Sequence, residues 1–264
     1  MNERHDQFPV RVLGGPTAVF EYGGLRFLTD PTFDAPGEYS RGNGRVMAKT
    51  AHPAAAPSSL GRIDVVLLSH DEHPDNLDTA GRALLADVPL TLTTPSAGRR
   101  LGDTLGAKVK GLADWETLDL ERPQGGTVTV TAVPAIHGPG TREEVEPITG
   151  QVVGFVLTGH DLPTVYVSGD NASLDVVEEI ALRCGPVDTA LLFAGAPRVP
   201  ALFDNQLLVL DSAMATDAAR ILDARRVVPV HYDSWTHFTE GRRELEDAFA
   251  AAGIAARLDW GQPD

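Results

Sequence analysis

Short apolar runs separated by glycine-rich turns fill the first third of the chain. Residues 10–13, 18–22 and 25–29 are β-prone, and Gly23-Gly24 between the last two runs predicts a hairpin. The continuous apolar run at 63–69, IDVVLLS, is typical of a strand that is buried on both faces. Residues 51–59, rich in Ala, Pro and Ser, are expected to form an extended loop. This region is therefore predicted to be mainly strand.

The rest of the chain mixes helical and strand patterns. Helical spacing of apolar positions occurs at 77–85 and 96–105, and residues 127–133 alternate between polar and apolar. The second half has expected strands at 152–158, 165–168, 189–193 and 227–230 and expected helices at 174–182, 213–222 and 242–252. Two halves with strands first and helices after predict an α+β fold. We expect a single domain over 1–264, an αββα sandwich of two packed mixed sheets with helices on both outer faces.

The chain is acidic and has one cysteine. Its 22 Lys and Arg against 37 Asp and Glu give a formal net charge of −15, so nucleic acid is not an expected partner. The sequence lacks both a signal-peptide pattern and an apolar run of the roughly 18 residues that a membrane span needs. We therefore expect a cytoplasmic protein with a small-molecule substrate, no membrane contact and a homo-oligomer as one option. Cys184 lies in a helix-like stretch, which favours a buried structural thiol and excludes a cysteine-based metal cage.

Three histidines and one aspartate follow strong strand patterns. His70 comes after VVLLS, His137 after TAVPAI and His231 after RVVPV, while Asp170 comes after YVSG. Strand ends hold side chains rigidly at one edge of a sheet, which is where α/β-type sheets place ligands. Each residue taken singly is compatible with a structural role. The four together predict a metal site.

The densest group of ionisable residues is SHDEHPDNLD at 69–78. Imidazole and carboxylate donors without thiolates suit Zn²⁺, Mn²⁺ or Fe²⁺. An acidic turn that begins a helix explains Asp75 or Asp78, because a carboxylate stabilises a helix N-terminus. It does not explain the neighbouring His70 and His73. We therefore expect one or two Zn²⁺ ions here, with Mn²⁺ or Fe²⁺ as alternatives.

Four motifs in order resemble the signature of the metallo-β-lactamase-fold hydrolase superfamily. They are the segment at 70–76, AIHG with His137, SGDN with Asp170 and PVHYD with His231. That signature is a His-x-His-x-Asp-His segment, a distant His, an Asp in a Gly-Asp pair and a final His. The opening EYGGLRFLTDP resembles the family's first hairpin, so the likeness covers nearly the whole chain. Within the superfamily, the chain is most similar to the branch that contains the ascorbate-phosphate lactonase and related stand-alone hydrolases.

Two positions depart from that signature. His70 and His73 are spaced His-x-x-His, so Glu72 occupies the usual position of the second ligand. Either His73 serves through a bulge, or Glu72 coordinates and His73 turns away; the spacing to Asp75 favours His73. Asn76 stands where the family has a histidine of the second metal site, which predicts a weak or empty second site.

The resemblance implies two sets of metal ligands, joined by Asp170: His70, His73 and His137 for one ion, and Asp75, Asp170 and His231 for the other. A divalent ion lowers the pKa of bound water to about 7–9 and so supplies hydroxide at neutral pH. Asp75 is the candidate to orient this hydroxide and to shuttle its proton. Asp30 either locks a histidine tautomer or is a turn residue before Pro31.

Further candidates come from two connections. The segment HYDSWTHFTEG at 231–241 places His237 against substrate, or else enters a helix with Trp235 and Phe238 in the core. The connection at 193–206 is a candidate lid, in which Arg198 is available to an anionic substrate. No role is assigned to the remaining histidines, and an acidic run is expected in a solvated loop: His5, His52 and His160, and Glu143, Glu144 and Glu146.

The leading hypothesis is a metal-dependent hydrolase in which Asp75 and His237 are the catalytic candidates. It uses metal-bound hydroxide to cleave an ester, lactone, amide or phosphoester of a small molecule. One alternative, suggested by Asn76, is a non-catalytic metal-binding remnant of the fold. Another is an iron-dependent oxygenase, because histidines and a carboxylate around an open position also suit Fe²⁺ and O₂.

Overall fold

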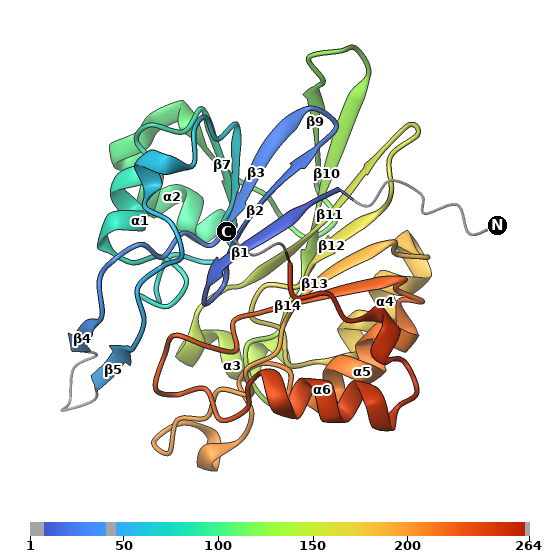
Figure 1. Cartoon of the computed structure of the whole chain (residues 1–264). Helices are drawn as coiled ribbons and strands as arrows, with labels where there is room; N and C mark the ends of the chain where they lie inside the picture. Colours follow the sequence, from blue (N-terminus) through green and yellow to red (C-terminus); the bar gives the residue numbers. More distant parts are fainter. Residues whose placement is uncertain (1–7, 41–45, 262–264) are drawn as a thin grey trace.

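Two six-stranded sheets lie face to face at the centre of the molecule (Figure 1). The computed structural model describes residues 8–40 and 46–261. The first sheet has the order β1-β2-β3-β6-β7-β8, with bounds Val10–Gly14, Thr17–Tyr22, Leu25–Thr29, Val65–Leu67, Leu90–Thr93 and Val109–Gly111. The second has the order β14-β13-β12-β11-β10-β9, with bounds Arg226–Val230, Thr189–Phe193, Val165–Val167, Val153–Gly159, Thr127–Pro134 and Thr117–Glu121. A separate hairpin pairs β4 (Gly37–Ser40) with β5 (Val46–Lys49).

Each large sheet joins an antiparallel half to a parallel half. In the first sheet β1, β2 and β3 are antiparallel, and β3, β6, β7 and β8 run parallel. In the second sheet β9 to β12 are antiparallel, and β12, β13 and β14 run parallel. Gly23 and Gly24 make the predicted turn between β2 and β3 with φ of +61° and +81°, values that favour glycine.

Helices cover the two outer faces of the sandwich (Figure 1). The first sheet carries α1 (Thr79–Leu84) and α2 (Pro95–Leu105), and the second carries α4 (Leu174–Cys184), α5 (Ser212–Ile221) and α6 (Arg242–Ala251). Side-chain caps begin α2, α4 and α5 at Thr94, Ser173 and Asp211. Short 3₁₀ segments occupy Pro57–Ser59, Gly106–Lys108, Phe203–Asn205 and Ala255–Arg257. Among the helices of the described ranges, none has the length and apolar character that crossing a bilayer requires.

The core has three layers because strand side chains alternate in direction. In β6, Val65 and Leu67 pack between the sheets, whereas Val66 packs under the helices of the first sheet. In β13, Leu191 faces the first sheet and Leu192 faces the helices of the second. Burying such side chains stabilises the fold by about 1.5–3 kcal/mol each. The expected αββα sandwich of two mixed sheets is confirmed.

The acidic run at 143–146 is helical, so the expectation of a solvated loop was wrong. It belongs to α3 (Arg142–Thr149), which begins with a capping box in which Thr141 N–H donates to Glu144 Oε2 at 2.8 Å. Arg142 pairs with Glu146 one turn later at 3.2 Å, and Val145 is buried. The three glutamates therefore lie on a helix that is fixed by its cap and by one apolar contact.

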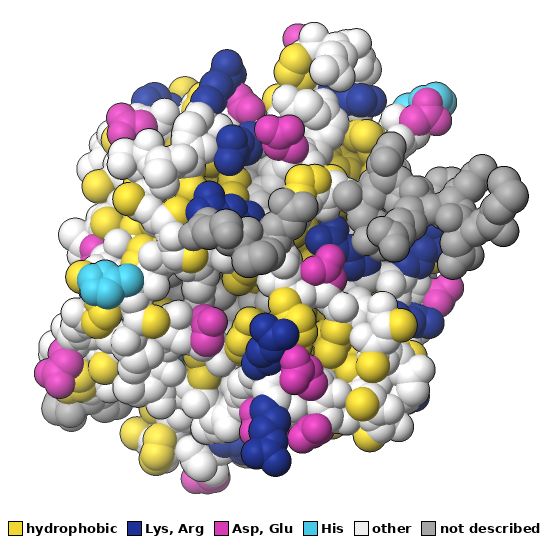
Figure 2. Space-filling model, in the orientation of Figure 1, with side chains coloured by type: hydrophobic (Ala, Val, Ile, Leu, Met, Phe, Trp, Pro, Cys, Tyr) yellow, Lys and Arg dark blue, Asp and Glu magenta, His cyan; other side chains and the backbone are white. Residues whose placement is uncertain are grey.

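Charged side chains of both signs are interspersed on the face shown in Figure 2, without a broad basic area. Cys184 is the last residue of α4 and is half-buried, which differs from the expected full burial. Five short strands, β4, β5, β7, β8 and β9, were absent from the sequence expectation.

The carboxyl ends of five strands meet at one edge of the sandwich. β3 and β6 run in parallel, and β10 has the same direction as β12 and β14 because β11 is antiparallel to both of its neighbours. The residues that the sequence singled out lie within the first three positions after these strands, namely Asp30, His70, His137, Asp170 and His231.

Candidate metal centre

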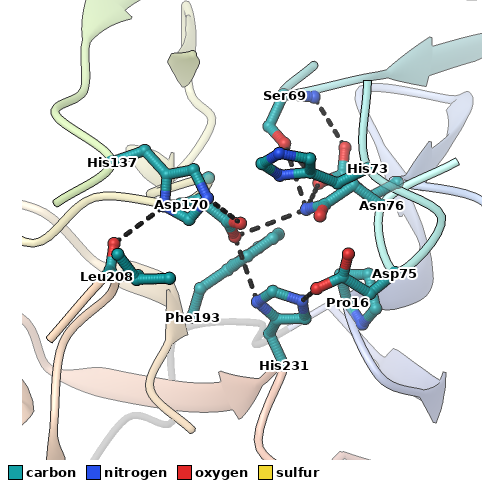
Figure 3. A network of polar contacts seen from close by, with 12 residues as sticks. Pro16, Ser69, His73, Asp75, Asn76, His137, Asp170, Phe193, Leu208 and His231 are labelled. Atoms are coloured by element: carbon teal, nitrogen blue, oxygen red, sulfur yellow. Dashed lines mark hydrogen bonds and ion pairs between the residues drawn. The ribbon is translucent and has the colours of Figure 1, made fainter. Parts of the chain in front are cut away.

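Four side chains from three loops converge at this edge (Figure 3). His70 and His73 follow β6, His137 follows β10 and Asp170 follows β12. One ligand atom from each of the four lies within 4.8 Å of the others. His70 Nε2 is 2.8 Å from His73 Nδ1, and His137 Nε2 is 3.6 Å from Asp170 Oδ2. These residues form the first ligand group.

A second ligand group shares one of these residues. Asp75, Asp170 and His231 also offer atoms within 4.8 Å of one another, and all three are buried. His231 lies between the two carboxylates, with Nδ1 3.0 Å from Asp170 Oδ1 and Nε2 3.2 Å from Asp75 Oδ2 (Figure 3). Asp170 thus lies where it can bridge the two groups, in the arrangement that the sequence motifs implied.

Glu72 faces away from both groups. Its carboxylate lies 3.1 Å from Arg100 Nη2, and its side chain is 38% exposed. His73 has the opposite orientation and belongs to the first group. Of the two alternatives at the stretched His-x-x-His segment, the geometry therefore matches the one in which His73 faces the site.

A buried hydrogen-bond chain orients His70. The Ser69 hydroxyl donates to Asp30 Oδ2 at 2.5 Å and lies 2.9 Å from His70 Nδ1. Ser69 N–H also donates to Asp30 Oδ1 at 2.6 Å. Asp30 thus reaches His70 through Ser69, a residue to which the sequence argument gave no role. The signal was its position directly before the first histidine.

A backbone carbonyl orients His137. The Leu208 carbonyl oxygen lies 2.8 Å from His137 Nδ1 and can only accept a hydrogen bond (Figure 3). Nδ1 therefore carries a proton, and Nε2 is the nitrogen that faces Asp170. Outer hydrogen bonds of this kind are typical of histidines that bind metals.

Burial and close charges shift the pKa values of the site in opposite directions. Burial lowers the pKa of His70 to about 4, so this imidazole is neutral at pH 7. Burial also raises the pKa of Asp30 to about 7, against the hydrogen bonds from Asn76 and Ser69. For His231, burial is outweighed by the Asp170 and Asp75 carboxylates, which raise its pKa to about 10.

The carboxylates of the second group are held in the ionised form. Burial works against ionisation of Asp75, but the His237 and His231 imidazoles hold its pKa well below the usual range. The pKa of Asp170 is lowered in the same way, against burial, by His231 and His137. Both side chains are therefore available as anionic ligands at neutral pH.

His237 contacts the second group from the cleft side. Its Nε2 lies 3.0 Å from Asp75 Oδ2, the same oxygen that lies 3.2 Å from His231 Nε2. The segment after β14 was expected either to contact substrate or to pack into the core, and it contributes residues to both the site and the core. His237 faces the site, Phe238 packs on the rings of His231 and His237, and Trp235 is buried beside Tyr39 and Lys49.

The backbone beneath the site approaches closely and is strained at one ligand. Gly169 has a φ of +59°, and a Cβ there would lie 2.6 Å from the Val153 carbonyl oxygen and 3.0 Å from Ser69 Cβ. His231 has a φ of +57°, which costs about 1–3 kcal/mol in a side-chain-bearing residue. Its N–H donates to the Gly15 carbonyl at 2.6 Å, which holds this conformation.

A cleft of about 360 Å³ opens above the two ligand groups. His73, Asp75 and His237 form its floor, and its walls come from β5, α3 and the connection after β13. The walls are mostly apolar: Val46, Met47, Ile148, Pro197, Val199, Pro200, Leu202 and Leu208. Arg198 is the cation among the described lining residues, and its Nη1 donates to the Asn205 carbonyl at 2.9 Å. No pattern in the sequence predicted this apolar lining.

The other histidines either lie away from the site or are not among the described residues. His52 and His160 are exposed, and His160 pairs with Asp161. His5 lies outside the described residues. The donor sets suit a divalent ion, because four imidazoles and two carboxylates converge without thiolates. Asp75 Oδ1 is also buried and has no hydrogen-bond partner within the described part of the chain, as expected of an oxygen that awaits a cation.

Known proteins resemble this chain in sequence as well as in fold. The beta-lactamase superfamily domain matches residues 25–232. A protein named metal-dependent hydrolase from Pyrococcus horikoshii is 26% identical over 237 residues, which cover 88% of each chain.

Solved structures share the fold at lower identity. An isothiocyanate hydrolase from Delia radicum gut bacteria superposes with a TM-score of 0.78 at 20% identity, covering 96% of this chain and 97% of that one. CmlA, a diiron β-hydroxylase from Streptomyces venezuelae, gives a TM-score of 0.64 at 18% identity and covers 97% of this chain and 51% of its own.

Proposed function

Because the chain belongs to the metallo-β-lactamase-fold superfamily of metal-dependent hydrolases, we propose that it hydrolyses a small, largely apolar ester, lactone or amide. The observation that carries the proposal is the placement of two His/Asp ligand groups, joined by Asp170, at the floor of an apolar cleft. Zn²⁺ is the proposed ion, because imidazole and carboxylate oxygen are its usual ligands at catalytic sites.

The residues around the cleft have different proposed roles in hydrolysis. The proposed ions are held by His70, His73, His137 and Asp170, and by Asp75, Asp170 and His231. A divalent ion at this position supplies Lewis acidity and an activated water. Asp75 is ionised and lines the cleft, so its carboxylate can accept a hydrogen bond from the attacking water and orient it. The apolar walls exclude other water from the reacting carbonyl.

The cleft supports carbonyl substrates over phosphate esters. Its described lining has a single cation, Arg198, whose guanidinium already donates to a backbone carbonyl. Apart from the proposed ions, a doubly charged phosphate monoester would find no cation on the described lining other than Arg198. A carbonyl compound with a short alkyl or aryl group matches the lining. The volume of the cleft, about 360 Å³, is near the lower end of the range for small-molecule sites. The relative that hydrolyses an isothiocyanate makes this compound class a useful further substrate for the test.

Oxidation by iron is the second candidate function. Histidines and carboxylates also suit Fe²⁺, and CmlA shares the fold. Consumption of O₂ by the iron-loaded protein, with no hydrolysis under any metal, would favour this candidate over the first.

The first experiment measures hydrolysis by metal-loaded protein. The panel contains p-nitrophenyl acetate and hexanoate, γ-butyrolactone and hexanolactone, benzyl isothiocyanate, and p-nitrophenyl phosphate. We expect turnover of a carbonyl substrate that His137→Ala and His231→Ala each abolish, with circular dichroism unchanged. Turnover that persists in both variants, or a clear preference for the phosphate ester, would contradict the proposal.

A matched pair of variants tests the apolar cleft. Each methylene buried there is worth about 0.8 kcal/mol, or roughly fourfold in kcat/KM. Ile148 is 53% exposed at the cleft wall, and Leu182 is 88% exposed on α4. Ile148→Asp should therefore reduce the preference for hexanoate over acetate by at least about threefold. Leu182→Asp, the control, should leave that preference as in the parent protein.

A further inference from the structure

The turn between His70 and His73 carries two carboxylates that face away from the metal centre. The Asp71 side chain is 4% exposed, and Glu72 lies at the surface. Neither residue belongs to a ligand group, although each is the chain neighbour of a histidine of the first group. A free carboxylate this close to a divalent ion would compete for it, because carboxylate oxygen is itself a common ligand. Both side chains therefore need partners outside the site.

One guanidinium binds both carboxylates. Arg100 Nε lies 3.1 and 3.2 Å from the two carboxylate oxygens of Asp71, and Arg100 Nη2 donates to Asp71 Oδ1 at 2.5 Å. The same Nη2 lies 3.1 Å from Glu72 Oε2. A planar guanidinium presents its donors in a fixed fork, so it can hold two carboxylates in one relative position. Arg100 therefore fastens the two residues between the histidines to α2.

Further contacts fix the same turn from other sides. Arg82 of α1 donates through Nη2 to the Asp71 carbonyl at 2.8 Å, and its Nη1 lies 3.9 Å from Asp71 Oδ2. Glu72 Oε2 packs against Gly150, directly after α3, where a Cβ would overlap it. The turn is thus held against three helices, and Arg100 is the side chain that reaches both of its carboxylates.

The path of this turn decides whether the two histidines meet. His70 Nε2 and His73 Nδ1 lie 2.8 Å apart and belong to one ligand group. His70 is held close to the end of β6 and contacts Ser69 Oγ at 2.9 Å. His73 reaches the same point because the two residues between the histidines follow one path. A metal site needs its ligands held to within about 0.5 Å by such supporting contacts.

We propose that Arg100 is a positioning residue of the first metal site. It holds Asp71 and Glu72 on the outside of the turn, and thereby places His73 beside His70 and keeps both carboxylates off the ion. The inference rests on the proposed function, since it presupposes a metal centre. It gives a part in metal binding to an arginine that lies outside both ligand groups.

Two consequences of removing Arg100 have opposite signs. A positive charge near a divalent ion repels it, so the loss of an arginine should strengthen metal binding slightly through charge alone. The loss of a positioning contact should weaken it. Arg99 is the matched control, because it is the adjacent residue of α2, is exposed and carries the same charge. The direction of the change therefore separates positioning from charge.

The test is a Zn²⁺ titration of metal-free protein in competition with a chromophoric chelator, which measures affinity without any assay of activity. The tighter equivalent is expected at the first group, because this group offers three imidazoles and the second group offers one. Arg100→Ala should bind this equivalent about 10-fold more weakly, the lower end of the loss for an outer partner of a metal ligand. Arg99→Ala should bind it as tightly as the parent protein or slightly more tightly.

A second set of measurements tests whether Arg100 acts through the turn. Asp71→Asn keeps the size of the side chain and removes the charge that the guanidinium binds, so it should also weaken the tighter equivalent. The double variant Asp71→Asn/Arg100→Ala should bind no more weakly than the weaker single variant, since both changes break one contact. The visible absorption of Co²⁺-loaded protein, which depends on ligand geometry, should change in Arg100→Ala and not in Arg99→Ala. Circular dichroism reports that the fold is kept.

Three outcomes would overturn this proposal alone. Arg100→Ala that binds the tighter equivalent as well as the parent protein, or better, would show that the turn keeps its path without the arginine. A double variant whose loss is the sum of the single losses would show that Arg100 does not act through Asp71. Equal weakening in Arg99→Ala would assign the loss to the surface of α2. A parent protein that binds no Zn²⁺ would overturn both this proposal and the proposed function.

Discussion

The Ser69 hydroxyl donates a 2.5 Å hydrogen bond to Asp30 Oδ2, and both residues are buried. A hydroxyl has one proton to donate, so the same oxygen must accept the Nδ1–H of His70 at 2.9 Å. His70 Nε2 is then unprotonated and points towards His73. One short contact behind the site thus determines which nitrogen of His70 is available to a metal ion.

Ser69→Ala should weaken the first metal site while preserving the fold. The change removes the acceptor that selects the His70 tautomer and leaves Asp30 with one donor fewer. Loss of such an outer hydrogen bond typically costs ~10–100-fold in metal affinity. The measurement is competition for the tighter Zn²⁺ equivalent with a chelator of known affinity. Ser59→Ala, at an exposed serine, is the control, and equal affinities in the two variants would contradict the tautomer argument.

Zn²⁺ uptake should release a proton at the second ligand group. Without a metal ion, the Asp170 and Asp75 carboxylates raise the pKa of His231 to about 10, so His231 is protonated at pH 7. The pKa of His70 is lowered to about 4 by burial, so His70 is already neutral and its Nε2 can bind a metal ion without releasing a proton. Because proton and metal compete for His231, affinity for the second equivalent should rise with pH, by at most about tenfold per unit, until pH 10.

Calorimetric titration in two buffers of different ionisation enthalpy measures that proton. The second equivalent should show a release of about one proton at pH 7.5. Affinity of the second equivalent that stays constant between pH 6 and pH 9 would show that His231 is not the group displaced.

Lys49→Met should destabilise the protein. Lys49 Nζ lies 3.1 Å from Asp78 Oδ2, with side chains 2% and 0% exposed. Removing one partner of a buried ion pair leaves an uncompensated charge and typically costs about 3–5 kcal/mol. Urea unfolding in excess chelator measures the change without a contribution from metal binding. Adding Asp78→Asn to Lys49→Met should recover part of the lost unfolding free energy. A double variant that is less stable than Lys49→Met alone would contradict the charge argument.

The fold could be predicted from sequence where apolar period and turn chemistry agreed. The runs at 18–22 and 25–29 with Gly23-Gly24 between them became a hairpin, and β13 and β14 match their predicted strands to within one residue. The strand at Leu90–Thr93 was missed because four residues give too little periodicity. The helix at Arg142–Thr149 was missed because Pro147 and three glutamates outweighed the Thr141–Glu144 capping pattern.

The candidate site could likewise be predicted only in part from the sequence. Residues at strand ends could be assigned because the direction of the strands brings their ends to one edge. Contacts between distant loops could not, as with Asp75 and His237, which are 162 positions apart. No local pattern encodes such a distance. The cleft walls come from β5, α3 and the connection after β13, and only tertiary packing brings these segments together.

The ligand set is divided between the two halves of the chain. The first sheet carries His70, His73 and Asp75, and the second carries His137, Asp170 and His231, so neither sheet holds a whole ligand group. An ion bound at Asp170 and both sets of loops would join the two sheets across the open edge of the sandwich. Metal would then bind only after both sheets have packed together. A chain in which they have not packed would lack the ion, would be inactive and would be easier to proteolyse.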